Sequence, residues 1–381
     1  GLVQKQANDL GNFYNLFLKS LTRILLPISF VVAVILLLNG TPTTFEGLQK
    51  TVTLEGDTVQ IATGPVAPVV AVKQVGTNGG GFFGPNSSHP FENPNYLTNI
   101  TENFSIFIIS AALIFAFGFY LNKKKLAWIF FFVMLAVMLT FIISAVAFEK
   151  AGNPKIAELG IEQPLGSMEG KEVRLGAEAS ALWGVTTTST SNGSVNSMHD
   201  SQMPLSGGIY MLDMMVNGVF GGVGVGFINF FMFVVIAVFI AGLMIGRTPE
   251  FLGKKIEARE VKIASLIILL HPFLILVGTA IAAVVATNNP DIGWLANPSF
   301  HGFSEMLYEF TSAAANNGSG FEGLGDNTAF WNIATGTVML IGRYLPIIGP
   351  IAIAGSLAAK KTVPESEGTL KVDTVAFGIV L

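Results

Sequence analysis

Three short polar stretches, each ending on Asn-Gly, contain the residues of this chain best suited to binding an ion. They are Gly76-Thr77-Asn78-Gly79, Thr190-Ser191-Asn192-Gly193 and Asn316-Asn317-Gly318. Their spacing of more than a hundred residues makes the repeating unit a whole module, since solenoid units are about 20–50 residues long. Glycine adopts positive φ at little steric cost, which lets neighbouring carbonyl oxygens turn toward one point. Such oxygens replace the hydration shell of a cation, so the stretches predict a selectivity filter.

A short amphipathic segment precedes each polar stretch, at residues 64–75, 177–188 and 302–313. We expect each segment to be a pore helix, because a helix carries about half a negative charge at its C-terminal end and favours a cation there. Asn-Gly is also a common turn dipeptide, and three surface turns are the alternative. That alternative leaves the three preceding segments unexplained.

Six apolar segments are long enough to cross a membrane, which takes about 20 residues. They lie at about 14–38, 101–121, 126–148, 219–246, 261–286 and 330–358, and a seventh begins at Val372. Charged residues make up only 12% of the chain, against about 25% in soluble domains. The sequence therefore predicts an all-α polytopic membrane protein. The chain has no cysteine, which excludes disulfides, thiolate metal sites and cysteine nucleophiles.

Basic residues are concentrated in the short connections between these segments. They are Lys123, Lys124, Lys125, Arg247, Lys254, Lys255, Arg259, Lys262, Lys360 and Lys361. Because Lys and Arg near span ends remain in the cytoplasm, we expect the long connections 39–100, 149–208 and 287–329 on the outer side. All three polar stretches then lie outside, as in parallel repeats, whereas the inverted repeats of secondary carriers would alternate. A coordinating ring takes about four contributions, so we expect a fourth from upstream of Gly1 or from another chain.

Two features predict a gate beneath the filter. The apolar stretch 209–246 is too long for one straight span at about 1.5 Å per residue, and a run containing Gly222 and Gly224 interrupts it. A tight helix-packing site is the alternative for these glycines. Arg343 lies near the middle of the last long apolar segment, where a charge is costly and usually functional. We expect it to face the pore, with an ion pair to a buried carboxylate as the alternative.

Three longer motifs resemble the potassium-binding A subunit of bacterial Kdp potassium-transporting ATPases. They are Gly76-Thr-Asn-Gly-Gly-Gly-Phe-Phe-Gly-Pro-Asn-Ser-Ser-His-Pro-Phe-Glu-Asn-Pro94, Gly242-Leu-Met-Ile-Gly-Arg-Thr-Pro-Glu-Phe-Leu-Gly-Lys-Lys255, and Ile341-Gly-Arg-Tyr-Leu-Pro346 continued by Ala354-Gly-Ser-Leu357. The resemblance implies span–re-entrant loop–span repeats around a pseudo-fourfold pore, as in the superfamily of potassium transporters. Residues 1–122, 123–248 and 249–361 would be the second, third and fourth repeats, and 362–381 would begin a truncated final span. The first repeat and the C-terminal end would then be missing.

The resemblance also implies a role in an ATP-driven uptake complex of the bacterial inner membrane. The chain would select potassium on the outer side with its filter loops and pass it to the B subunit, a P-type ATPase, with a C subunit and a small F subunit as further partners. Hydrolysis would occur in the B subunit, and the chain itself has neither a P-loop nor an Asp-Lys-Thr-Gly motif. We expect no cofactor besides transported K⁺, no nucleic-acid partner and, because the four histidines are scattered, no transition metal. A stand-alone potassium channel or uptake protein of the same superfamily is the alternative.

Overall fold

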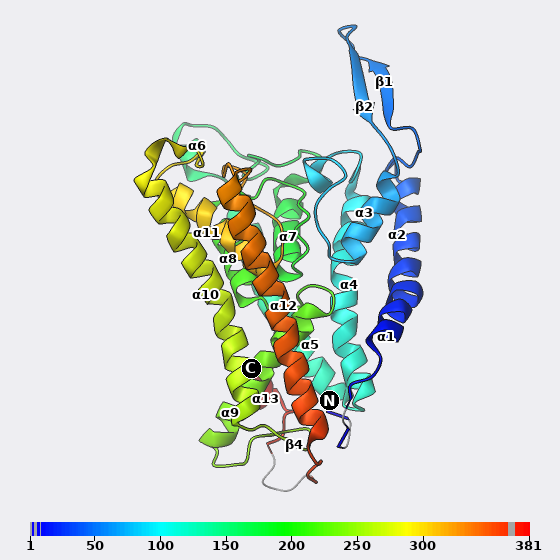
Figure 1. Cartoon of the computed structure of the whole chain (residues 1–381). Helices are drawn as coiled ribbons and strands as arrows, with labels where there is room; N and C mark the ends of the chain where they lie inside the picture. Colours follow the sequence, from blue (N-terminus) through cyan, green and yellow to red (C-terminus); the bar gives the residue numbers. More distant parts are fainter. Residues whose placement is uncertain (1, 4–5, 8, 365–369) are drawn as a thin grey trace.

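The long apolar segments of the sequence form helices that run along the length of the molecule (Figure 1). The computed structural model describes residues 2–3, 6–7, 9–364 and 370–381. Within these described residues, six helical segments are long and apolar enough to cross a membrane. They comprise α1 (Phe13–Ser20) continued through a π-helical turn (Leu21–Leu25) into α2 (Leu26–Leu38), α4 (Tyr96–Tyr120), α5 (Lys124–Ala151), α9 (Val225–Met244), α10 (Ala258–Asn288) and α12 (Ala329–Ala359).

In the described part of the chain, a candidate span lies at each of the six predicted positions, with differences at the ends. The second begins at Tyr96, five residues before the predicted start, because Asn95 caps it. The Asn95 side chain accepts hydrogen bonds from the backbone N–H groups of Leu97 and Thr98, and the Thr98 hydroxyl lies 3.0 Å from the Asn95 backbone nitrogen. This reciprocal cap satisfies N–H groups that have no partner within the helix, and it extends the helix beyond its apolar run.

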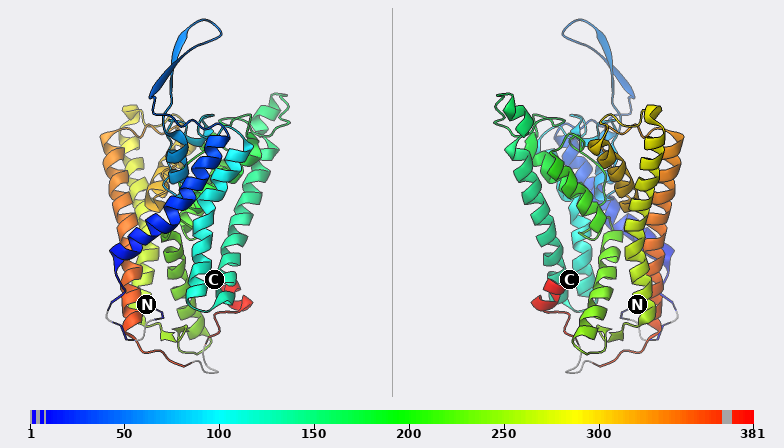
Figure 2. Two further views of the ribbon diagram at one scale, coloured as in Figure 1. Left: turned by 90° about the vertical axis from the view of Figure 1, so that its right-hand side faces the viewer. Right: turned by 90° about the vertical axis from the view of Figure 1, so that its left-hand side faces the viewer.

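Three shorter helices lie among the long ones, in the upper half of the molecule as drawn in Figures 1 and 2. They are α3 (Val66–Val75), α7 (Gly176–Ser189) and α11 (Phe300–Ala315). Each ends at or directly before one of the polar stretches, as the sequence predicts for the three pore helices. In α7, every residue except Gly176, Glu178 and Leu182 is buried. This burial shows that neighbouring elements cover most of the helix, and the exposed Glu178 and Leu182, four residues apart, lie on its one uncovered face.

The predicted interruption of the apolar stretch 209–246 is also confirmed. Helix α8 (Pro204–Val216) ends at Asn217, and α9 begins only at Val225. The connection turns sharply, with a φ of +66° at Gly221 and +87° at Gly224. A Cβ atom added to Gly221 would lie 2.1 Å from the Cα of Gly226, so the two backbones meet where only glycine leaves room. The apolar run therefore contains a helix, a glycine loop and a second helix.

The remaining elements lie at the two ends of the bundle. The hairpin of β1 (Leu48–Val52) and β2 (Thr58–Ala62), antiparallel with Lys50 opposite Gln60, projects from the upper end in Figure 1. The others are α6 (Pro154–Glu158), two 3₁₀ turns (Asn86–Ser88 and Pro290–Ile292), β3 (Glu250–Phe251) paired with β4 (Lys254–Lys255), and α13 (Val375–Val380). In the predicted segment 362–381, residues 365–369 lie outside the described part of the chain. Helix α13 packs against α5.

Candidate functional site

The three polar stretches share one backbone conformation. In each stretch the ending glycine and the residue two positions before it have positive φ: Thr77 (49°) and Gly79 (69°), Ser191 (50°) and Gly193 (87°), Asn316 (55°) and Gly318 (103°). The residue before the glycine is asparagine in all three, and its backbone N–H donates to the carbonyl oxygen five residues earlier, at 2.8, 3.0 and 2.9 Å for Asn78, Asn192 and Asn317. The stretches are therefore three copies of one turn at the C-terminal end of a short helix.

The second and third stretches each contact the helix that leads into the preceding stretch, through their asparagine side chains. The amide nitrogen of Asn317 donates to the carbonyl oxygen of Thr187 at 2.7 Å. That of Asn192 donates to the carbonyl oxygen of Lys73 at 3.3 Å. The two acceptors occupy equivalent positions, five residues before the asparagine of their own stretch. The second stretch therefore contacts α3 in the same way that the third stretch contacts α7.

The glycines that end the first two stretches lie directly against the next stretch. A Cβ atom added to Gly79 would lie 1.9 Å from the carbonyl oxygen of Asn192, and one added to Gly193 would lie 2.0 Å from that of Asn317. Both distances are far below any van der Waals contact. Glycine is therefore required here for the approach of neighbouring stretches as well as for the positive φ that the sequence predicts.

Hydroxyl groups support the second and third stretches from within their own helices. The Thr187 hydroxyl accepts a hydrogen bond from the backbone N–H of Gly193, and the Ser312 hydroxyl accepts one from that of Gly318, both at 2.9 Å. In the first stretch the equivalent residue is Lys73. Its ammonium group is buried and forms an ion pair with the fully buried Glu92 and a 3.0 Å hydrogen bond with the Ser87 hydroxyl.

The buried Lys73–Glu92 pair leads to a prediction about stability. Lys73→Met should lower the unfolding free energy by about 3–5 kcal/mol, because the Glu92 carboxylate would stay buried without its partner. Lys150→Met is the matched control, since Lys150 pairs with Glu178 at an exposed site where its side chain is 70% accessible. Exposed pairs contribute little, so the control should melt like the wild type. Thermal unfolding of the two purified variants compares them, and equal melting temperatures would contradict the prediction.

The sequence reasoning missed two buried carboxylates, which are hydrogen-bonded to residues near the ends of the short helices α3 and α7. Glu102 accepts hydrogen bonds from Gln74 at 2.7 Å and from the Ser87 hydroxyl at 2.8 Å. Asp213 accepts hydrogen bonds from the hydroxyls of two neighbouring residues at the end of α7, Thr188 at 2.9 Å and Ser189 at 2.6 Å. Both acids interrupt apolar segments of the sequence. Because an acidic residue in such a segment is costly and usually functional, this interruption could have identified them.

A buried chain of hydrogen bonds supports the third stretch. The Asn317 side-chain oxygen accepts from the backbone N–H of Ser319, whose hydroxyl lies 2.8 Å from the Tyr308 hydroxyl. The Tyr308 hydroxyl in turn lies 2.8 Å from Nδ1 of His199. Burial lowers the pKa of His199 to about 3, so its imidazole stays neutral at physiological pH. These hydrogen bonds thus join His199, in the second long connection, to the third stretch without placing a charge there.

A cavity of about 380 Å³ opens against the start of the polar stretches. It brings together seven residues predicted from the sequence: Gly76, Thr77, Asn78, Ser191, Asn316, Gly222 and Arg343. The other predicted residues, Gly79, Thr190, Asn192, Gly193, Asn317, Gly318 and Gly224, do not line it. Apart from Gly224, these residues are the parts of the three stretches that do not face the cavity.

The glycine loop between α8 and α9 forms one wall of this cavity. The backbone N–H of Gly221 donates to the carbonyl oxygen of Ser189 at 2.8 Å. The backbone N–H of Val223 donates to the Thr77 hydroxyl at 3.0 Å. The glycine loop is therefore hydrogen-bonded to α7 and to the first polar stretch. It lies across one side of the cavity.

Arg343 reaches the cavity from α12. Its Nε donates to the side-chain oxygen of Asn316 at 3.0 Å. Among the described residues, no carboxylate lies within ion-pair distance of Arg343, so the alternative of a buried ion pair receives no support within that part of the chain. The guanidinium group therefore leaves a positive charge at a cavity lined by backbone and amide groups.

Comparison with known proteins gives a family match over the whole chain. Residues 1–381 match the family model described as the potassium-transporting ATPase A subunit, KdpA. A "potassium-transporting ATPase potassium-binding subunit" of Flavobacterium psychrophilum is 58% identical over 389 residues, which cover 100% of this chain and 68% of the relative. The proteins of that name from Phocaeicola vulgatus and Geobacillus kaustophilus are 59% and 50% identical, and the matches cover 68% and 67% of their lengths.

Proposed function

This chain belongs to the family of potassium-transporting ATPase A subunits, and we propose that its three Asn-Gly stretches form the potassium-selecting filter of that protein. The chain is a potassium-binding, non-catalytic component of the Kdp ATPase. The filter residues are the four of the first stretch (76–79), the four of the second (190–193), and Asn316, Asn317 and Gly318 of the third. Their backbone carbonyl oxygens coordinate K⁺ in place of its hydration shell.

The observation that carries this proposal is the head-to-tail contact between the stretches. Asn192 and Asn317 each donate to the equivalent carbonyl oxygen in the short helix that leads into the preceding stretch, and the ending glycine of that preceding stretch lies against the asparagine carbonyl of the next. Contacts of this kind, in which one copy binds the next through different surfaces, generate a ring when the rotation between copies closes. The proposed arrangement is a pseudo-fourfold pore of parallel span–loop–span repeats, with residues 1–122, 123–248 and 249–361 as three of its quarters.

The short helices supply electrostatic support for a cation. Helices α3, α7 and α11 each end at a polar stretch, so their negative dipole ends point to the filter. The predominance of basic residues in the short connections favours an outer location for the filter, in a bacterial membrane that the six candidate spans cross. Ions leave through the cavity lined by Gly222 and Arg343, with the glycine loop as its gate.

Membership of the Kdp ATPase implies other Kdp subunits as partners. The finer proposal is that a P-type B subunit hydrolyses ATP and receives the ion, and that a C subunit and a small F subunit complete the complex. Because this chain supplies the ion selectivity and a partner supplies the hydrolysis, a defect in the filter should alter how ATP hydrolysis depends on K⁺.

Potassium-stimulated ATP hydrolysis by the complex, copurified with the full-length protein, tests the filter. Gly193→Asp places a charged side chain where an added Cβ alone would lie 2.0 Å from a carbonyl oxygen. We expect the variant complex to assemble and to need more K⁺ for half-maximal hydrolysis, with weaker discrimination against Na⁺. Unchanged K⁺ dependence and unchanged discrimination would refute the filter assignment. Potassium conduction by the isolated protein without an ATPase partner would instead favour a stand-alone channel.

A further inference from the structure

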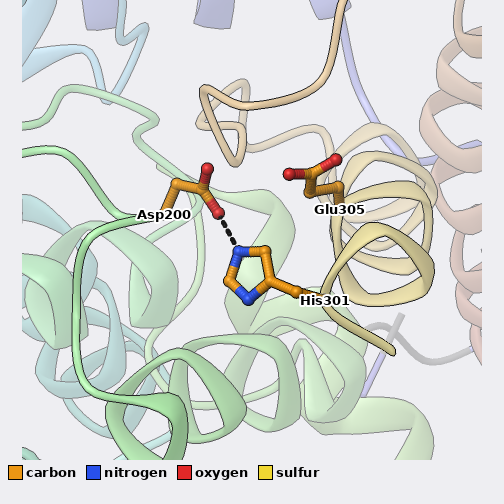
Figure 3. Close-up of side chains that lie close together, drawn as sticks. All are labelled: Asp200, His301 and Glu305. Carbon is orange, nitrogen blue, oxygen red and sulfur yellow. Dashed lines mark hydrogen bonds and ion pairs between the residues drawn. The ribbon is translucent and has the colours of Figure 1, made fainter. Parts of the chain in front are cut away.

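A cluster of three side chains lies away from the polar stretches, where the second long connection meets α11. We propose that Asp200, His301 and Glu305 bind one divalent transition-metal cation of the Zn²⁺ class. One ligand atom from each side chain lies within 4.8 Å of the other two. Figure 3 shows the three side chains turned toward one another, with Nε2 of His301 2.5 Å from Oδ1 of Asp200.

The fold brings these groups together from distant parts of the sequence. His301 and Glu305 are four residues apart on α11, which places them on the same face of the helix. Asp200 lies about a hundred residues earlier, just beyond the second polar stretch. The sequence expectation of no transition metal considered the spacing of histidines alone. A histidine and a glutamate at positions i and i+4 were the signal that it passed over.

Glu305 gives the independent indication that a ligand belongs here. Its side chain is fully buried, and its Oε1 accepts a hydrogen bond from the Asn297 amide at 2.9 Å. Its Oε2 is buried and has no hydrogen-bond partner among the residues that the structure describes. An unpaired buried carboxylate oxygen is costly, since it has lost water and gained nothing in return. A cation held with Asp200 and His301 would supply the missing partner.

The surroundings hold the two carboxylates in place for such a cation. Asp200 Oδ2 accepts a hydrogen bond from the backbone N–H of Gly323 at 2.9 Å. The backbone N–H of Asp200 donates to Glu322 at 3.0 Å. A Cβ atom added to Gly323 would lie 2.4 Å from Oε1 of Glu305 and 2.5 Å from Oδ2 of Asp200, so bare backbone fits against both acids. Hydrogen bonds of this kind orient the ligands in metal sites.

Charge and donor type favour a metal over a simple ion pair. A protonated His301 could neutralise one carboxylate, but the second would remain uncompensated, because no Lys or Arg in the described part of the chain forms an ion pair with Asp200 or Glu305. One imidazole nitrogen and two carboxylate oxygens match the ligands of Zn²⁺, which commonly leaves its fourth position to water. The His301 side chain is 42% accessible, which gives a cation in solution a route to the site.

Binding of Zn²⁺ alone to the metal-stripped, full-length protein in its purified complex tests the proposal. We expect one Zn²⁺ per chain by titration calorimetry, and at least about tenfold weaker binding in both Glu305→Gln and His301→Ala. Glu305→Gln keeps the size of the side chain, so it remains informative should His301→Ala fail to fold. His89→Ala is the matched control, since His89 lies in another long connection, and it should retain the zinc.

Two further readouts separate this site from the filter. Zn²⁺ should raise the melting temperature of the wild type and not that of Glu305→Gln, because a ligand stabilises only a state that binds it. Excess K⁺ should leave the zinc affinity unchanged. Absence of zinc binding by the wild type, equal zinc binding by Glu305→Gln, or displacement of the zinc by K⁺ would each overturn the proposal.

Discussion

Gly79→Ala should raise the K⁺ concentration for half-maximal ATP hydrolysis by at least about tenfold, which corresponds to about 1.4 kcal/mol of lost ion binding. The methyl group would lie 1.9 Å from the carbonyl oxygen of Asn192. That oxygen must move, and if it coordinates K⁺ as proposed, the ion loses a ligand or meets it at a strained position. The purified complex, assayed over a range of K⁺ concentrations, gives the measurement.

The neighbouring glycine provides a control for backbone strain. Gly80 has a φ of +72°, close to the +69° of Gly79, but an added Cβ would meet no atom within 4 Å. Gly80→Ala therefore carries a similar conformational penalty without the clash. We expect it to keep nearly the wild-type K⁺ dependence, and equal shifts in the two variants would show that contact between the stretches does not determine ion affinity.

Arg343→Gln should allow K⁺ to cross proteoliposomes that contain the complex in the absence of ATP. A guanidinium charge at the cavity repels a cation and raises its energy there. Glutamine removes the charge but can still donate a hydrogen bond to Asn316, the present partner of Arg343. The third stretch should therefore stay supported in this variant. The expected result is a passive K⁺ flux across the liposome membrane.

A second substitution separates the charge of Arg343 from its shape. Arg343→Lys keeps a positive charge on a side chain of different form, so its liposomes should remain as tight as those of the wild type. If Arg343→Gln also remains tight while its ATP-driven uptake persists, the residue is no barrier to ions. If both variants leak, a positive charge alone is insufficient, and the shape of the guanidinium group is required to block the path.

The sequence predicted those parts of the fold that depend on local pattern. Long apolar segments determined the six candidate spans, and glycine spacing located the interruption between α8 and α9. The helix ends were less accurate, as at Tyr96, because the Asn95 cap extends that helix through residues whose hydropathy is unremarkable. The three short helices were predicted because each directly precedes a recognisable polar stretch.

Contacts between distant residues could not be predicted in this way. The bond from Asn317 to Thr187 joins positions 130 residues apart, and the one from Asn192 to Lys73 joins positions 119 apart. Hydropathy and turn patterns describe only the near sequence, so they indicate that a turn forms without indicating what it touches. The ion pair of Lys73 with Glu92 was missed for the same reason. The two residues lie on either side of the first polar stretch, and neither local pattern indicates that they meet.

The positive-φ residue two positions before the ending glycine has a different partner in each polar stretch, although the backbones match. The Thr77 hydroxyl accepts from the Val223 backbone, the Ser191 hydroxyl lies 3.4 Å from the Asn217 side chain, and Asn316 accepts from Arg343. An ion leaving a ring of identical subunits would meet equivalent walls and depart on any side with equal probability. Here the surroundings of the three stretches are unequal: Thr77 lies beside backbone, Ser191 beside an amide and Asn316 beside a guanidinium charge. If the stretches bind K⁺ as proposed, that inequality gives the ion a preferred sideways direction, which a coupled pump requires and a passive pore does not.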